Sequence, residues 1–172
     1  MQQKKNGRTR LQSDAVRQER LESNVGKKYM HNYHCIASDL PESVIVTALT
    51  PTGEHTEIGI GLWDTGADYT TLNKYFADKL GIDPMPPMDE DGEPVAAINE
   101  RYLGTATARL RIGDIQLPMD VVKIVDFDPD GQKRAAGRNI PDVLIGMDII
   151  GQGNFKVESS TGDETILTFE LL

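Results

Sequence analysis

Asp64, Thr65 and Gly66 form a tripeptide whose residue types and position suggest catalytic chemistry. They follow residues 58–63, where apolar and small residues alternate as they do in a strand. A carboxylate at the end of an apolar strand is costly to bury unless hydrogen bonds satisfy it. Gly66 permits a tight turn that brings backbone N–H groups near this carboxylate, and Thr65 adds a hydroxyl that can bond to another segment. Taken alone, the tripeptide is better explained by an ordinary Asp-initiated turn.

A second stretch, residues 143–148 (Val-Leu-Ile-Gly-Met-Asp), changes this balance. It is another apolar run that ends at a glycine, Gly146, and a short helix is expected after it. Together with residues 63–68 (Trp-Asp-Thr-Gly-Ala-Asp), it resembles the retropepsin-like aspartic proteases over about residues 34–172. In this resemblance the first stretch is the catalytic loop, and the second is the strand-to-helix step that packs against it.

The resemblance implies a mostly β fold, a closed or partly closed barrel of the retropepsin-like acid protease type. One helix is expected after the catalytic loop, over residues 72–80, and a short helix near the C-terminus. The first helix makes the chain more similar to cellular and bacterial relatives than to retroviral ones. Met147 departs from the family pattern, because many retroviral members carry an arginine there that joins a charge network with the acid at Asp68.

The implied activity is that of an aspartic endopeptidase. This chemistry needs two close carboxylates that share a proton and activate a water, with no cofactor and no metal. The chain has one such motif and no room for a second lobe, so the resemblance implies a homodimer that cleaves a peptide or protein substrate. The implied roles are catalysis for Asp64, loop support for Thr65, Gly66 and Ala67, and substrate binding for Gly66, Asp68 and the flap-tip residues Ala97, Ile98 and Asn99. A non-catalytic dimerisation or peptide-binding module of the same fold is the alternative.

Charge divides the 172-residue chain into two parts. Residues 1–28 carry eight of the 18 basic and three of the 27 acidic residues, which leaves residues 29–172 with ten basic and 24 acidic ones. We therefore expect a basic, disordered or loosely helical extension over residues 1–28 and a protease domain over 29–172. An acidic domain argues against a nucleic-acid partner, except through the basic tail.

The remaining composition excludes several classes. No apolar stretch is long enough to cross a membrane and no secretory signal is seen, while Cys35 as the single cysteine fits a reducing compartment, so a cytoplasmic protein is expected. His31, His34 and Cys35 are too few for a zinc site. Residues 126–131 open like a calcium loop, but Gly137 stands where a bidentate Glu should close it, which favours a solvated acidic turn.

Local patterns predict the elements around these motifs. A hairpin over residues 95–104 and 105–112 corresponds in position to the family's flap, with an ordinary edge hairpin as the alternative. Thr70 and Thr71 are expected to cap the helix over residues 72–80, and Gly81 to end it. Strands are expected over residues 34–38, 43–49, 57–63, 115–125 and 143–145, a polar loop over 132–139, a short helix over 147–152, and a terminal hairpin over 154–158 and 165–172.

Overall fold

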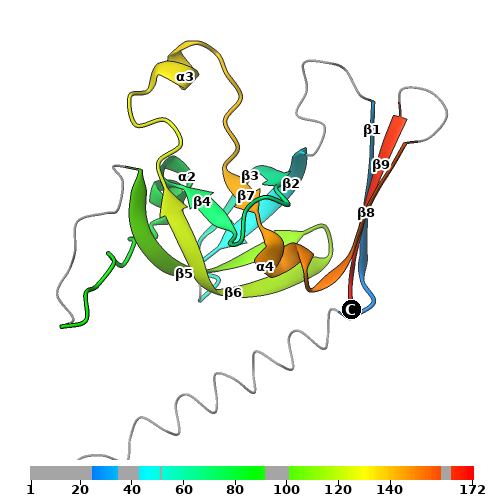
Figure 1. Cartoon of the computed structure of the whole chain (residues 1–172), viewed down its shortest axis with the longest axis horizontal. Coiled ribbons are helices and arrows are strands. Elements are labelled where there is room, and N and C mark those ends of the chain that lie inside the picture. Colours follow the sequence, from blue (N-terminus) through cyan, green and yellow to red (C-terminus); the bar gives the residue numbers. More distant parts are fainter. Residues whose placement is uncertain (1–24, 35–42, 51, 92–100, 160–163) are drawn as a thin grey trace, which may run out of the picture.

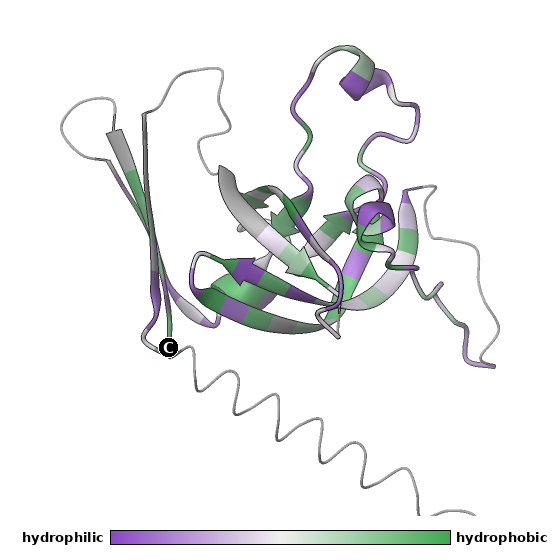
Figure 2. Ribbon diagram, turned by 180° about the vertical axis from the view of Figure 1, so that it is seen from behind, coloured by the Kyte–Doolittle hydropathy of each residue, from purple (hydrophilic) through white to green (hydrophobic). Residues whose placement is uncertain are grey.

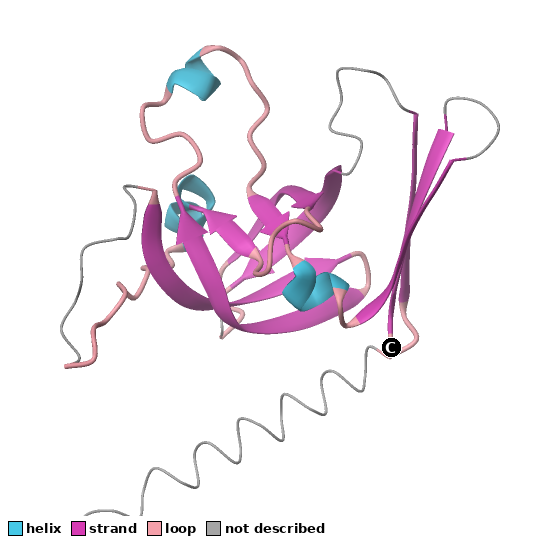
Figure 3. Cartoon of the chain, viewed as in Figure 1, coloured by secondary structure: helices cyan, strands magenta, loops and turns pink. Residues whose placement is uncertain are grey.

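The computed structural model describes residues 25–34, 43–50, 52–91, 101–159 and 164–172. Strands make up most of it (Figures 1 and 3). They are β1 (Lys28–His34), β2 (Ser43–Leu49), β3 (Thr56–Trp63), β4 (Thr71–Asn73), β5 (Tyr102–Ile112), β6 (Ile115–Val125), β7 (Val143–Ile145), β8 (Gly153–Ser159) and β9 (Glu164–Leu171). The helices of the described ranges are α2 (Lys74–Leu80), α3 (Gln132–Ala135) and α4 (Met147–Ile150). The predicted mostly β class is confirmed.

Six of these strands close into a barrel in the order β2-β3-β7-β4-β6-β5, with β5 returning to β2 (Figure 1). Most neighbours are antiparallel, but β3 pairs with β7 and β4 with β6 in parallel. Side chains alternate across each strand, so every second residue can fill the interior. Figure 2 shows the resulting bands of hydrophobic and polar residues along the barrel strands. The largest fully buried barrel residues are Leu72, Leu110, Ile112, Ile115, Leu117, Ile124 and Ile145.

Helix α2 buries Phe76, Ala77 and Leu80 in this core. Its Phe76 ring reaches β3 at Gly59, where an added Cβ would stand only 2.8 Å from the ring, so a glycine is needed for this close approach. Gly81 ends the helix in the left-handed conformation at φ 68°, as predicted.

The predicted start of this helix is wrong. The expected helix over residues 72–80 begins only at Lys74, because residues 71–73 form β4. This strand pairs with β6 on one side and β7 on the other, so strand partners satisfy backbone groups that a helix would have used. Thr70 and Thr71 consequently do not cap the helix. The N-cap position belongs to Asn73, whose side chain makes no capping hydrogen bond.

A three-stranded sheet in the order β1-β9-β8 stands beside the barrel (Figure 1). The predicted terminal hairpin is confirmed as β8 and β9. The first strand lies earlier than predicted, because β1 ends at His34, and residues 35–38 of the expected strand fall outside the described ranges. Strand β1 pairs with β9 along its whole length, which joins the two ends of the domain. The extension over residues 1–28 stays a prediction, except that β1 already includes Lys28.

The Trp63 side chain joins this sheet to the barrel. Its ring lies 5.0 Å from Phe155 and 5.2 Å from Phe169, measured between ring centroids, and both contacts are tilted. Trp63 is 3% exposed and Phe169 is fully buried. The last residue of β3 therefore packs against the terminal sheet, and Asp64 follows directly after it.

The second arm of the expected flap hairpin, residues 105–112, is present. It belongs to the continuous strand β5, which already begins at Tyr102. Here β5 forms an isolated antiparallel bridge with the preceding chain: Met85 and Thr105 exchange two backbone hydrogen bonds, at 2.7 and 2.9 Å. Gly104, at φ 138°, approaches the Met85 carbonyl so closely that an added Cβ would lie 2.1 Å from its oxygen. The expected tip near residues 97–99 lies outside the described residues, so the hairpin stays a prediction, and the Met85–Thr105 bridge is the part of its base that the structure describes.

The polar loop expected over residues 132–139 contains a short helix, α3, which is exposed. The Arg134 guanidinium lies 3.8 Å from the Tyr75 ring centroid and ties this segment to α2. Figure 2 shows polar colours concentrated around α3. The acidic turn predicted before it is present, with Asp128 accepting hydrogen bonds from the backbone N–H groups of Lys133 and Arg134.

Candidate active site

Asp64 lies where β3 leaves the barrel beside β7. Its backbone N–H donates to the Ile145 carbonyl at 2.9 Å, which extends the parallel pairing of these strands by one residue. The chain then turns: the Ala67 N–H donates to the Asp64 carbonyl at 3.2 Å. The Gly66 N–H donates to Asp64 Oδ1 at 2.9 Å. The predicted turn, with a backbone N–H group directed at the carboxylate, is therefore present.

The tip of this loop faces solvent. Asp64 and Ala67 are half-buried, whereas Thr65, Gly66 and Asp68 are exposed. An added Cβ at Gly66 would lie 3.3 Å from Asp64 Oδ1, so a side chain there would crowd the carboxylate. No hydrogen bond of the Thr65 hydroxyl is found within the described residues. The loop thus presents a carboxylate, a hydroxyl and a glycine backbone on one surface.

The base of the loop is fixed by α4, as predicted from the resemblance. The Met147 N–H donates to the Ala67 carbonyl at 2.8 Å, and the Asp148 N–H donates to the Asp68 carbonyl at 3.2 Å. The first turn of α4 thereby uses two of its otherwise unpaired N–H groups to bind the loop. Figure 1 shows α4 between the barrel and the terminal sheet.

A buried polar network completes this attachment. Asp148 Oδ1 accepts the Thr70 N–H at 2.8 Å, the Thr70 hydroxyl at 2.7 Å and the Ile149 N–H at 3.0 Å. Thr70 Oγ1 in turn accepts the Gly146 N–H at 3.0 Å. Sequence reasoning missed both Thr70 and Asp148, because their partners lie more than 70 residues away. The signal was weak: Asp148 is the last residue of the second motif, and Thr70 is a polar residue two positions after the first.

Gly146 is required where the two motifs touch. An added Cβ there would lie 2.6 Å from the Tyr69 carbonyl carbon and 2.8 Å from the Thr70 nitrogen. Both are backbone atoms, which cannot move without shifting the loop. The glycine that ends the second motif therefore allows the first motif to pack against it.

Two large apolar side chains flank the exposed loop. Tyr69 is 49% and Met147 is 41% exposed. The Lys123 ammonium lies 4.4 Å from the Tyr69 ring centroid. Met147 occupies the position of the arginine in many retroviral members, so the charge network with Asp68 that the resemblance raised is not built from this residue.

The other predicted substrate-binding residues, Ala97, Ile98 and Asn99, lie outside the described residues. The structure brings Asp64, Thr65, Gly66, Ala67 and Asp68 together in one loop and leaves the flap assignment a prediction. At the base of the expected flap, the structure describes the Met85–Thr105 pair.

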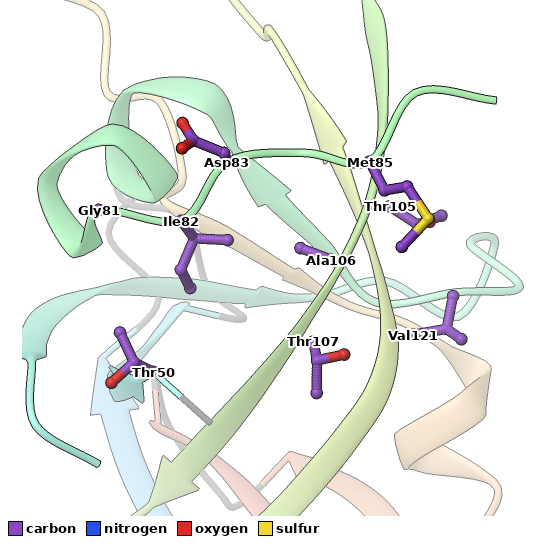
Figure 4. A pocket seen from close by; sticks show the side chains of 9 residues that line it. All are labelled: Thr50, Gly81, Ile82, Asp83, Met85, Thr105, Ala106, Thr107 and Val121. Carbon is purple, nitrogen blue, oxygen red and sulfur yellow. The ribbon is translucent and has the colours of Figure 1, made fainter. Parts of the chain in front are cut away.

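A cavity of about 390 Å³ lies beside this base (Figure 4). The chain segment that carries Ile82, Asp83 and Met85 crosses β5 at Thr105 and Ala106, as the figure shows. None of the loop residues 64–68 lines the cavity. The cavity is therefore separate from the candidate active site.

The described residues contain no cluster of three or more His, Cys, Asp or Glu side chains that could hold a metal ion. In the acidic turn, desolvation acts to raise the pKa of Asp128. The hydrogen bonds from Lys133 and Arg134 and the positive charges of these residues outweigh it and place the pKa below its usual value. Within the described ranges, no helix has the length and apolar character needed to span a membrane.

Comparisons with known proteins add little to this geometry. No family model matches the chain, and no curated protein sequence matches it. Among solved structures, it is similar to the retroviral protease-like domain of Ddi1 from Leishmania major. The two share 11% sequence identity over 75% of this chain and 92% of that one, with a TM-score of 0.40. This similarity is too low to support a conclusion on fold or function.

Proposed function

We propose that this chain is an aspartic endopeptidase of the retropepsin-like type, active as a homodimer in which two Asp64 carboxylates meet. The observation that carries the proposal is the Asp64 loop itself. Its carboxylate accepts the Gly66 N–H at 2.9 Å, and the loop is exposed at its tip and anchored at its base to α4. A turn that served only to connect two strands would need neither a half-buried carboxylate beside an exposed glycine nor this second attachment.

In the proposed reaction, the two carboxylates share one proton, because two like charges at this distance cannot both be ionised. The ionised Asp64 takes a proton from a water molecule, and the oxygen of that water attacks the scissile carbonyl carbon. The protonated Asp64 of the second copy donates its proton to the carbonyl oxygen. When the C–N bond breaks, the leaving nitrogen takes the proton that Asp64 accepted from the water, and a hydroxyl of the tetrahedral intermediate returns a proton to the partner's carboxylate. The pair again holds one proton, as at the start.

The exposed parts of the loop fit this assembly. The Thr65 hydroxyl is free to bond to the partner's loop, the Gly66 backbone can face the substrate, and Asp68 can contact the substrate's peptide groups. Tyr69 and Met147 add apolar surface next to the loop that a second copy would cover. Their exposure in one copy supports a homodimer.

Two carboxylates that contact β3 or its loop, Asp142 and Asp148, are used elsewhere, which also supports a second copy. Asp148 Oδ1 accepts the Thr70 and Ile149 N–H groups, and Asp142 Oδ2 accepts the Ile60 N–H at 2.9 Å. Each of these carboxylates is committed to backbone groups. A second Asp64 supplies the missing partner at the lowest structural cost, because it needs only a two-fold axis through the loop.

The proposed substrate is a peptide or protein in an extended conformation, and the proposed location is the cytoplasm. No cofactor is part of the mechanism. A non-catalytic dimerisation or peptide-binding module of the same fold is the second candidate, and the exposed loop by itself fits it as well.

The test compares wild type with Asp64→Asn in peptide-library cleavage, at several protein concentrations and at about pH 4 to 7. Asp114→Asn, in the turn between β5 and β6, is the matched control because it removes a carboxylate far along the chain from the loop. We expect cleavage by wild type and Asp114→Asn only, rising more steeply than protein concentration. Cleavage that survives Asp64→Asn would rule out the mechanism. Peptide binding without any cleavage would favour the non-catalytic module.

A further inference from the structure

Lys123, on β6, places a positive charge beside the Asp64 loop. Its ammonium lies 4.4 Å from the centroid of the Tyr69 ring, and Tyr69 directly follows Asp68 at the end of the loop. The strand itself also touches the loop here, because the Lys123 N–H donates to the Thr70 carbonyl at 3.2 Å. The lysine is therefore held next to the loop by both its backbone and its side chain.

The Lys123 ammonium does not neutralise a carboxylate of its own domain. Val122 and Ile124 are fully buried in the barrel, so the alternation of side chains puts Lys123 on the outside. Among the described residues, no carboxylate forms an ion pair with it. The Tyr69 ring attracts the cation and limits the positions it can take, yet it leaves the N–H donors available. A carboxylate from outside the chain can therefore bind there.

The charge of the surroundings makes this lysine stand out. Residues 29–172 hold ten basic and 24 acidic side chains, so the domain as a whole attracts basic peptides. Asp64 and Asp68 add to the negative charge at the loop. The overall charge and the unpaired Lys123 ammonium thus predict opposite preferences. Only the preference that comes from Lys123 should depend on where in the peptide a charge lies, because it acts at contact distance.

The length of the loop limits where such a carboxylate can lie in a substrate. Tyr69 is five residues after Asp64. Even a straight chain would place the two no more than about 18 Å apart. The turn shortens this distance, since the Ala67 N–H donates to the Asp64 carbonyl. An extended substrate covers the same distance in about five residues, so an acidic side chain within about five residues of the scissile bond can reach the ammonium.

We propose that Lys123 is a specificity-determining residue, which pairs with an aspartate or glutamate of the substrate within about five residues of the scissile bond. This inference rests on the proposed protease function. In the proposed homodimer the substrate lies between two Asp64 loops, so each copy places one Lys123 beside the substrate, one on either side of the scissile bond. The substrate class is then a peptide with an acidic residue near the cleaved bond.

The test reverses the charge with Lys123→Glu in the full chain, and Lys123→Arg keeps it. Lys79→Glu is the matched control, because the Lys79 ammonium also lies over a tyrosine ring, 4.5 Å from the centroid of Tyr75, but on α2. Lys79→Glu changes the net charge by the same amount as Lys123→Glu. The substrates are variants of one peptide that wild type cleaves. Each carries Glu, Gln or Lys at one of the positions within about five residues of the scissile bond.

At one position or more, we expect wild type, Lys123→Arg and Lys79→Glu to have a kcat/KM about three- to tenfold higher for the Glu peptide than for the Gln peptide. The difference should lie mainly in KM and should shrink with added salt. Lys123→Glu should prefer Lys at the same position. A preference for Glu that wild type lacks, or that Lys123→Glu keeps, would overturn the proposal. So would an equal loss for all three peptides, because Lys123 would then only support the loop.

A binding measurement separates this inference from the proposed function. Fluorescence anisotropy of two labelled peptide pools, one with glutamate and no lysine and one with lysine and no glutamate, is measured with Asp64→Asn and with Asp64→Asn/Lys123→Glu. A shift of the binding ratio toward the lysine pool by about tenfold in the second protein supports the role of Lys123, whether or not wild type cleaves any peptide. An unchanged ratio, or no binding of either pool, rejects it. Absence of cleavage by wild type rejects the protease assignment alone.

Discussion

Asp148 Oδ1 accepts both the backbone N–H and the hydroxyl of Thr70, at 2.8 and 2.7 Å. The two residues lie 78 positions apart in the chain, one at the end of the Asp64 loop and one in α4. The Thr70 oxygen also accepts the Gly146 N–H, so one hydroxyl links both motifs.

Thr70→Val keeps the side-chain shape and removes the hydroxyl. The Asp148 carboxylate then loses one donor, and the buried Gly146 N–H loses its acceptor. We expect the free energy of unfolding to fall by about 1–3 kcal/mol, since an unpaired buried polar group costs that much. Chemical denaturation measures it. Thr56→Val, at an exposed strand position, serves as the control and should change stability by less than about 0.5 kcal/mol. An equal loss of unfolding free energy in Thr70→Val and Thr56→Val would show that the Thr70 hydroxyl network does not stabilise the fold.

Gly146→Ala should disturb the Asp64 loop. The new methyl group would lie 2.6 Å from a backbone atom of Tyr69, so the loop must shift or the contact with β7 must open. We expect a loss of about 1–3 kcal/mol together with a large loss of peptide cleavage. Gly81→Ala gives the comparison, because that site is open but has φ 68°. Its cost of about 1 kcal/mol should leave cleavage unchanged. An active, stable Gly146→Ala protein would show that the two motifs do not need this close contact.

Trp63 is the single tryptophan of the chain, so tryptophan fluorescence reports on the contact between β3 and the terminal sheet. Phe155→Ala removes a ring whose centroid lies 5.0 Å from it and lets water approach the indole. We expect a red shift of the emission maximum and a lower unfolding temperature. Phe155 is only partly buried, so the cost should stay below the roughly 3–5 kcal/mol of a fully buried phenylalanine. Phe127→Ala, in the acidic turn, should leave the emission unchanged. The same spectrum for both variants would contradict the packing of the terminal sheet on β3.

Mixing wild type with Asp64→Asn tests the two-fold assembly directly. If the active unit is a dimer that needs both carboxylates, an equal mixture should retain about one quarter of the activity of pure wild type at the same total concentration, because only one dimer in four pairs two intact copies. Pre-equilibration and subunit exchange can be followed by native mass spectrometry. Retention of about half would indicate that each copy works alone.

The acidic turn should respond to pH in a defined direction. Because the pKa of Asp128 is lowered in the folded chain, its ionised form stabilises the turn at and above the usual aspartate pKa of about 3.9. This contribution is lost as the pH falls through the lowered pKa. NMR titration of the Asp128 carboxyl carbon, together with the Lys133 and Arg134 amide signals, should give one shared midpoint below that value. In Asp128→Asn the amide midpoint should vanish. A midpoint above 3.9 would contradict the hydrogen-bonding pattern.

Several features of this protein could be read from its sequence because they depend on local chemistry. Alternating apolar residues predicted β2, β3 and β6. The position of Gly81 predicted where α2 ends, and the position of Gly146 predicted where α4 begins. The turn at Asp64 followed from the small residues after it. The two motifs also predicted that loop and α4 would touch, which the Met147–Ala67 and Asp148–Asp68 hydrogen bonds confirm.

Other features were decided only by the tertiary structure, because partners distant in sequence compete with local preference. Residues 71–73 have a helical pattern, yet they form β4 because β6 and β7 offer ladder partners on both sides. Likewise residues 28–34 form β1 because they pair with β9, and β5 is continuous because β6 pairs along it. The roles of Thr70 and Asp148 depend on a contact across 78 positions. Local residue types thus determined the Asp64 loop, whereas long-range pairing decided how that loop is supported.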